Sequence, residues 1–366
     1  MEVQPKAATG VIRSGGINTY VNPCTHNDIP MNKFGVILLN MGGPTDLDSV
    51  QPFLENLFND EEIISFGPMN PFRKPLARFI SKTRSKTVRE NYAMIGGKSP
   101  IRELTERQAQ ALQRVLEERY GQGKVQIEVG FSYWKPFIQD AMQRLRESGI
   151  REVFLMTLYP HYSKTTSGSC FKTWRNVHRE WGNDIFHPMS VKAYPTNTLF
   201  LKAINERIDE ALAEFPEERS EDVHLLFSAH GTPESLVREG DPYSHEIKAT
   251  VAAVMQARGN DLPHSLSYQS KVGPAKWLEP NTEDYTEELG KKGVKNLLVI
   301  PVAFVSDHIE TLHELGIELR ETAHECGIEE FRVTEGLNDS DLFIAALANE
   351  IVPKIEKRMK QLELAA

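Results

Sequence analysis

Short, continuous runs of apolar residues recur along the chain from residue 33 onward, and amphipathic stretches separate them. Seven runs rich in Val, Ile, Leu and Phe are predicted to be strands: residues 34–40, 125–131, 152–159, 223–229, 265–269, 296–302 and 331–334. Such runs are typical of parallel strands that are buried on both faces. Between them, residues 137–148, 199–214, 245–256 and 342–359 have helical spacing of apolar positions. This alternation predicts βαβ units and an α/β fold with doubly wound parallel sheets.

The two halves of the chain resemble each other at three predicted strand ends. Residues 41–44, 130–136 and 155–163 are matched, in the same order, by residues 230–233, 268–274 and 298–306. This predicts two similar domains that arose by internal duplication. Ligands of such sheets bind outside the carboxyl ends of the strands, where all six segments lie. We therefore expect a binding cleft between the two domains.

The predicted domains are residues 33–195 and 196–340, followed by a C-terminal helix in residues 341–366. Residues 1–32 are polar and lack both the apolar core of a secretory signal and the Arg-rich pattern of a transit peptide, so we expect a loose extension. The first half also contains an insertion, residues 59–104, in which aromatic and aliphatic residues alternate with Arg and Lys. An insertion at the cleft end of a sheet indicates a lid or lip, and this composition suggests docking on anionic lipid.

Composition narrows the class of protein. The 366 residues carry a net charge of -9, which argues against a nucleic-acid-binding protein held by its overall field. The three cysteines, Cys24, Cys170 and Cys326, are far apart and form no CxxC pair, which argues against a cysteine-built zinc or cluster site. No apolar run approaches the length of about 18–20 residues that a membrane span needs. These features favour a reducing compartment, the cytoplasm.

Two segments have the residues for proton or metal chemistry. His230 ends an apolar strand and is followed by a Gly-Thr-Pro turn, so its imidazole could transfer protons, although a hydrogen bond to a backbone carbonyl is the alternative. Glu310, Glu314 and Glu318 are spaced i, i+4, i+8 and would share one face of a helix, where a plain solvated face is the alternative. Residues 41–44 lack a nucleotide-binding pattern, and residues 163–169 could be an anion-binding loop or only a helix cap.

Five motifs, taken in order, resemble those of ferrochelatases. They are residues 38–44, 95–101, 230–243, 268–274 with Trp277 and Leu278, and 306–311, and the resemblance extends over residues 33–356. It implies a lyase that inserts ferrous iron into a porphyrin in the last step of haem synthesis. It also implies two Rossmann-like domains around a porphyrin cleft.

The resemblance assigns roles to individual residues. It implies that His230 is the active-site histidine and that Glu310 is its acidic partner, while Glu314 and Glu318 complete a set that guides metal or protons. The implied substrate-binding residues are Met41, Tyr92, Ser99, Tyr133, Tyr243, Trp277, Asp307 and His308. Met41 and Tyr133 would face His230 across the porphyrin.

The chain departs from its relatives at three positions. Ser132 stands where many relatives have Arg, Thr232 replaces an aliphatic residue, and Lys164 stands where animal members have one of four cysteines that bind an iron–sulfur cluster. We therefore expect no iron–sulfur cluster and no permanently bound cofactor, with Fe²⁺ as a substrate. The expected partners are porphyrin, ferrous iron and a membrane surface that the chain contacts peripherally, but no nucleic acid.

Several functions remain open at this point. The long apolar insertion favours protoporphyrin IX as the substrate, but a coproporphyrin ferrochelatase is the nearest alternative. Cobalt or nickel chelatases that act on sirohydrochlorin-type rings share the fold, but they lack the motif at 306–310. A non-enzymatic porphyrin or haem carrier would keep the cleft without needing His230 and Glu310. The expected location is the cytoplasm or the inner face of the membrane.

Overall fold

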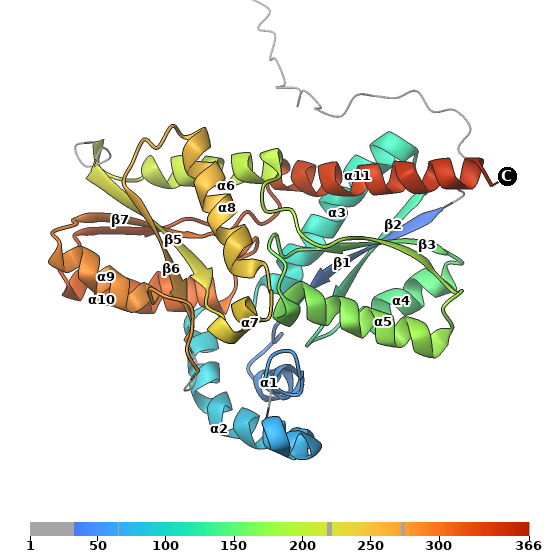
Figure 1. The fold of residues 1–366 in the computed structure, drawn as a ribbon, viewed down its shortest axis with the longest axis horizontal. Coiled ribbons are helices and arrows are strands. Elements are labelled where there is room, and N and C mark those ends of the chain that lie inside the picture. The colour runs from blue at the N-terminus through green and yellow to red at the C-terminus, as the bar shows by residue number, and fades with distance from the viewer. Residues whose placement is uncertain (1–32, 65, 218–221, 272–274, 366) are drawn as a thin grey trace, which may run out of the picture.

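A computed structural model describes residues 33–64, 66–217, 222–271 and 275–365 (Figure 1). The predicted N-terminal extension, residues 1–32, lies outside this range. Among the described residues, none of the helices combines the length and the hydrophobicity that a membrane span requires.

Two four-stranded parallel sheets form the framework of the molecule. The first has the order β2-β1-β3-β4 and the second the order β6-β5-β7-β8. The strands are β1 (Phe34–Asn40), β2 (Val125–Phe131), β3 (Glu152–Thr157), β4 (His187–Val191), β5 (Val223–His230), β6 (His264–Gln269), β7 (Asn296–Pro301) and β8 (Glu330–Val333). The identical order of the two sheets confirms the predicted duplicated, doubly wound α/β fold.

One strand, β4, was not predicted from the sequence. It reads His-Pro-Met-Ser-Val, so only two of its five residues continue the apolar pattern. It pairs with β3 alone, at the edge of the sheet, and its first two residues are exposed. An edge strand does not need the continuous apolar run that the sequence criterion requires.

Helices cover both faces of the two sheets, and one large core joins them. On the outer faces, α4 (Ile138–Glu147) and α5 (Ser169–Trp181) cover the first sheet, and α9 (Thr282–Lys291) and α10 (Leu319–Glu325) cover the second. The shared core includes Phe154 of the first sheet and Phe227 of the second, together with Leu347 of α11 (Asp341–Glu363). In Figure 1, α11 runs beside α6 (Thr198–Leu212) and α3 (Ile101–Tyr120), so this helix spans both sheets.

The inserted segment projects away from the two sheets. It forms a short helix, η1 (Gly67–Phe72), and the long helix α2 (Arg73–Met94), which packs on α1 (Val50–Phe58). A small core of its own holds this unit together and includes Phe53, Ala77 and Tyr92. Figure 1 shows α1 and α2 below the main body, which is where a lip at the mouth of a cleft would lie.

Each half contains a π-helix at the equivalent place. The first, η2 (Lys164–Gly168), follows β3 and leads into α5, and the second, η4 (Glu310–Glu318), follows β7 and leads into α10. Ser163 caps η2, because its side chain accepts a hydrogen bond from the Thr165 amide. Of the two sequence interpretations of residues 163–169, the helix cap is therefore the one that the structure adopts.

The structure corrects one part of the internal repeat. The sequence comparison paired Pro136 with Pro274, which lies outside the described residues. The carbonyl of Pro136 accepts a hydrogen bond from the Phe131 amide, and that of Pro280 accepts one from the Tyr268 amide, both at 2.8 Å. The counterpart of Pro136 is therefore Pro280, because the second loop is longer than the sequence alignment assumed.

Candidate active site

The carboxyl ends of β5 and β7 bring His230 and Glu310 together. His230 is the last residue of β5, and Glu310 is the first residue of η4, which follows β7. Their side chains are joined by a hydrogen bond of 2.9 Å between Nδ1 of His230 and Oε2 of Glu310. The parallel pairing of β5 with β7 explains this contact, since neighbouring parallel strands end at the same edge of a sheet.

The electrostatics of this pair favour a charged imidazole and a charged carboxylate. Burial lowers the pKa of His230. The negative charge and hydrogen bond of Glu310, with a smaller effect from Glu314, together raise this pKa by more than burial lowers it, so the net shift is upward. Burial raises the pKa of Glu310, but His230 and His308 lower it by more, so it lies well below its ordinary value. A proton accepted by His230 is therefore stabilised by the adjacent carboxylate.

Glu314 lies next in the site and is held by Ser270. The Ser270 amide donates to Oε1 of Glu314 at 2.7 Å, and the Ser270 hydroxyl donates to Oε2 at 2.5 Å. Burial and the nearby charge of Glu310 raise the pKa of the Glu314 carboxyl group. Two adjacent carboxyl groups with opposite pKa shifts can hold and pass on a proton.

Glu318 does not join this group. Its side chain is 57% exposed, and it lies 3.6 Å from Nδ1 of His313. The sequence interpretation assumed an α-helix, in which residues four apart share a face. In the π-helix η4, hydrogen bonds span five residues, which brings His313 and Glu318 together instead.

The predicted metal set of His230, Glu310, Glu314 and Glu318 is consequently not assembled as one group. Within the part of the chain that the structure describes, no three His, Cys, Asp or Glu side chains are arranged to hold a metal ion. The physical reason is that Glu310 is bonded to His230 and Glu314 to Ser270, while Glu318 points into solvent.

Two aromatic rings support His230. The Tyr243 hydroxyl donates to the backbone carbonyl of His230 at 2.9 Å, so this predicted substrate-binding residue fixes the end of β5. The Phe304 ring packs edge-on against His230, with 6.2 Å between ring centroids, and against His308 at 4.4 Å. Sequence reasoning missed Phe304 because it directly follows a buried strand and looks like an ordinary core residue.

His308 and Asp307 have different environments. Nδ1 of His308 lies 3.1 Å from the Ser306 carbonyl, which fixes the hydrogen on that nitrogen, and Nε2 lies 3.7 Å from Oε2 of Glu310. The Asp307 carboxylate instead accepts from the Gly336 amide and the Asn338 side chain. Asp307 therefore holds a loop in place, and its contact with substrate stays a prediction.

The opposite wall contains Tyr133, which is bonded to a carboxylate that the sequence analysis missed. The Tyr133 hydroxyl donates to Oδ2 of Asp60 at 2.7 Å and lies 3.1 Å from the Ser169 hydroxyl, which also bonds Asp60. Burial, followed by the charge of Asp60, raises the pKa of Tyr133 well above its usual range. No recognisable signal marks Asp60 in the sequence, because it begins an acidic run at the base of the insertion.

The two walls meet in one apolar cluster. Met41, Tyr92 and Tyr133 belong to it, and so does Ile309, the neighbour of Glu310. Burial and the charge of Glu310 raise the pKa of Tyr92, so this residue of α2 lies within electrostatic reach of η4. Ser99, which is buried, hydrogen-bonds Tyr92. Three of the predicted residues from the first domain, Met41, Tyr92 and Tyr133, thus share a cluster with the residue next to Glu310.

Trp277 packs beside the turn that follows His230. It pairs with Pro233, and its ring lies 3.2 Å from the position that a Cβ atom on Gly231 would occupy. That same Cβ would lie 2.8 Å from the carbonyl oxygen of Gln269. Glycine at position 231 therefore allows the tryptophan and the neighbouring strand to approach the histidine loop closely.

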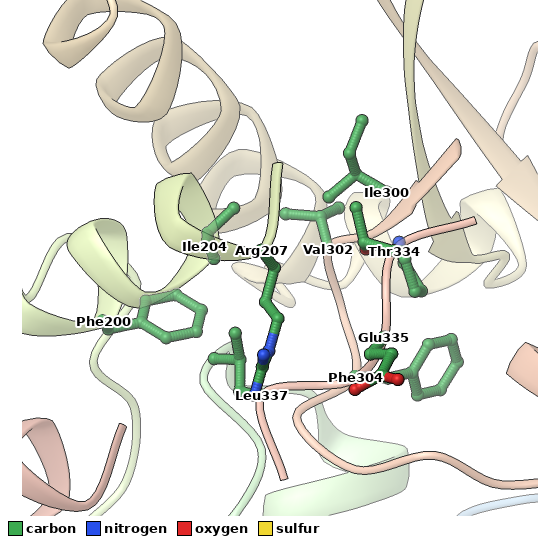
Figure 2. Close-up of a pocket in the computed structure, with 10 residues that line it drawn as sticks. Phe200, Ile204, Arg207, Ile300, Val302, Phe304, Thr334, Glu335 and Leu337 are labelled. Carbon is green, nitrogen blue, oxygen red and sulfur yellow. The ribbon is translucent and has the colours of Figure 1, made fainter. Parts of the chain in front are cut away.

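A small void also borders Phe304 (Figure 2). It has a volume of about 10 Å³, and Figure 2 shows Arg207, Leu337 and Glu335 around it. A space of this size holds about one water molecule, so it is not a porphyrin site. His230 and Glu310, by contrast, place an imidazole and its carboxylate partner after neighbouring strands, where they could exchange protons with a ligand.

Comparisons with known proteins point to one family. The family model described as ferrochelatase matches residues 33–355. The ferrochelatase of Geotalea uraniireducens is 47% identical over 319 residues, covering 87% of this chain and 96% of the relative. That of Aquifex aeolicus is 45% identical over 315 residues (86% and 97%), and that of Trichormus variabilis is 44% identical over 341 residues (92% and 86%).

A solved structure shows the same fold at much lower identity. It is SirB from Bacillus subtilis with Fe3+, which has a TM-score of 0.50 and 11% identity, covering 87% of this chain and 94% of that one. At this identity the likeness concerns the fold alone. The extent of the family match and the identity to the curated relatives show that the chain belongs to the ferrochelatase family.

Proposed function

We propose that the protein inserts Fe²⁺ into protoporphyrin IX to give protohaem, the terminal step of haem synthesis. Membership of the ferrochelatase family makes it a lyase that places a metal in a porphyrin. The observation that carries the proposal for this chain is the hydrogen-bonded pair of His230 and Glu310, which follows neighbouring strands and lies beside the cluster of Met41, Tyr133 and Ile309. A porphyrin carrier would not need such a proton-accepting pair.

The hydrogen-bonded pair of His230 and Glu310 would accept the first pyrrole proton. Metal insertion replaces two pyrrole N–H protons by one Fe²⁺ ion, so two protons must leave the ring. Because Glu310 is ionised, neutral His230 donates its Nδ1 hydrogen to that carboxylate. Its Nε2 lone pair is then the proton acceptor, and the imidazolium that forms is stabilised by Glu310.

Glu314 is proposed to receive a proton from the pair. Burial and the charge of Glu310 raise its pKa, which favours its protonated form, and its Ser270 hydrogen bonds fix its orientation beside Glu310. Glu318, which is exposed and further along η4, would exchange that proton, or an incoming cation, with solvent. In this scheme iron is a substrate that passes through weak contacts with hard carboxylates and imidazole.

The choice of porphyrin is proposed from the insertion. Its apolar side chains favour protoporphyrin, which has fewer carboxylates than coproporphyrin. An anaerobic assay with Fe²⁺ and either porphyrin, followed by loss of the free-porphyrin absorbance, tests this choice. We expect higher kcat/KM with protoporphyrin. Higher kcat/KM with coproporphyrin would contradict the proposed substrate, and no turnover of either would contradict the proposed activity.

We also propose a cytoplasmic protein that docks on the inner membrane face through the insertion. Met69, Phe72 and Phe79 are 50%, 65% and 67% exposed, and exposed Lys74 and Lys82 lie among them. Apolar side chains interleaved with cations suit an anionic lipid surface. In vesicle co-sedimentation, Phe72→Glu/Phe79→Glu should bind less than wild type, whereas equal binding would contradict docking. A matched control, Leu312→Glu, alters an exposed apolar residue outside the insertion.

We propose, finally, that the enzyme works without an iron–sulfur cluster. Lys164 stands where the family resemblance would put one cysteine ligand of a cluster. Its ammonium group lies 3.6 Å from Glu62 and 3.8 Å from Glu239. A lysine in this ion-pair network is not a cluster ligand. Iron and inorganic sulfide analysis of the purified protein, which should find neither in stoichiometric amount, tests this expectation.

A further inference from the structure

A loop of the first domain is fastened to the start of α8 (Tyr243–Ala257) in the second domain. The loop, residues 161–164, joins β3 to η2. Its contacts come from three side chains that lie on α8 or directly before it: Asp241, Glu246 and Thr250. We refer to these loop residues and their three partners as the interdomain latch. In Figure 1, α7 (Glu234–Arg238) and α8 lie against the segment that leads into α5.

Two of the three contacts join the domains without involving Asp241. Nε2 of His161 lies 2.8 Å from the Thr250 hydroxyl, and burial lowers the pKa of His161 to about 3, so this contact is between neutral groups. The Tyr162 amide donates to Oε2 of Glu246 at 2.7 Å. Both are bonds between a first-domain loop and one face of α8.

The third contact is made by the Asp241 carboxylate, which accepts hydrogen bonds from both domains. Oδ2 of Asp241 accepts from the Lys164 amide at 2.7 Å and from the Ser163 hydroxyl at 3.0 Å, both in the first domain. Oδ1 accepts from the Tyr243 amide at 3.0 Å, within the second domain. A single carboxylate thus bonds the N-terminal end of η2 and the first residue of α8.

Tyr243 links Asp241 to His230. Its hydroxyl donates to the His230 carbonyl at 2.9 Å, and its ring packs edge-on against His161, with centroids 6.2 Å apart. The residue is 6% exposed, so the phenol is held between the latch and the end of β5. Displacing the Tyr243 backbone would therefore move the hydrogen bond that fixes the histidine loop.

We propose that Asp241 is a positioning residue that transmits the docking of the two domains, through Tyr243, to the orientation of His230. The inference deepens the proposed function, because it rests on His230 being the group that accepts a pyrrole proton. Glu246 has a comparable bond to the same loop but accepts no hydrogen bond from Tyr243, so we expect it to contribute to docking alone. A small misplacement of a reacting group lowers the rate of the chemical step without weakening substrate binding in proportion.

The test compares Asp241→Ala with its matched control, Glu246→Ala, in the full chain. Each variant removes one carboxylate that accepts a backbone amide of residues 162–164, so we expect similar falls in melting temperature. Only Asp241→Ala should lower kcat, by about tenfold, with the KM values for iron and porphyrin within about twofold of wild type. Asp241→Asn retains one acceptor oxygen and should recover part of the lost kcat. It replaces Asp241→Ala in the comparison if the alanine variant does not fold.

A double-variant comparison shows whether the effect passes through Tyr243. If it does, Asp241→Ala/Tyr243→Phe, or the same pair with Asp241→Asn, should have a kcat no lower than about that of its slower single variant. Multiplicative losses, or equal kcat in the Asp241 and Glu246 variants, would overturn the inference. Undiminished turnover by His230→Ala would instead refute the proposed function itself, so the two failures are distinguishable.

Discussion

Replacing Glu310 by Gln should lower the pKa of His230 and shift the pH dependence of kcat. The charged hydrogen bond of 2.9 Å between them would become a neutral one. Hydrogen bonds to charged groups contribute about 1.5–3 kcal/mol. Because the His230 side chain is 38% exposed, solvent screens the interaction, and we take the lower end, about 1.5 kcal/mol. At about 1.4 kcal/mol per pKa unit, the expected fall is about one unit.

The direction of the shift follows from the role of the imidazole. His230 must be neutral to accept a proton, so kcat rises as pH increases through its pKa. The wild-type pKa lies above the ordinary value, and Glu310→Gln should move the acidic limb of the profile about one unit towards lower pH, with a lower plateau. Steady-state assays between pH 5.5 and 9, roughly the range in which imidazole groups titrate, measure this. An acidic limb that stays in place or moves to higher pH would refute the pairing of His230 with Glu310. Glu325→Gln is the control variant.

Four further variants test other parts of the site. Turnover should fall most in Glu310→Gln, less in Glu314→Gln and least in Glu318→Gln, with similar thermal melts throughout, since burial decreases along η4. Gly231→Ala should destabilise the protein by about 1–3 kcal/mol in urea unfolding, because its new methyl group would lie 2.8 Å from a carbonyl oxygen. Tyr133→Phe should cost about 1–3 kcal/mol in the same assay, since a partly buried carboxylate loses a hydrogen-bond donor.

The sequence predicted the strands that are buried on both faces but missed the edge strand. β1 has the predicted bounds, because its apolar run is continuous and ends in turn residues. β2 also has the predicted bounds, although Gln126 and Glu128 interrupt its apolar residues and it is only partly buried. β4 contains a proline and two exposed residues, so hydrophobicity could not reveal it. The order of the sheets also agreed with the internal repeat, since each matched segment lies at the carboxyl end of a strand.

The site was predictable where a side chain is fixed by a strand end and not where it depends on helix type or long-range packing. The apolar run before His230 predicted its place at a strand end, whereas its pairing with Glu310 was implied by the family resemblance and is made possible by the neighbouring strands β5 and β7. The exposure of Glu318 could not be foreseen, because nothing in the spacing of its residues distinguishes the π-helix η4 from an α-helix. Asp60 and Phe304 become part of the site only through contacts with segments more than 70 residues away.

The most direct test of the central claim is the rate of a single turnover in His230→Ala with porphyrin already bound. Porphyrin fluorescence would first establish that the variant binds its substrate, and Fe²⁺ would then be mixed in without oxygen. His224→Gln, altered on the same strand but bonded to Ser265, is the control. Loss of a general base typically costs 10²–10⁴-fold, so the account expects insertion to slow by about 100-fold or more while the control keeps the wild-type rate. Insertion by His230→Ala within a few-fold of wild type would contradict it.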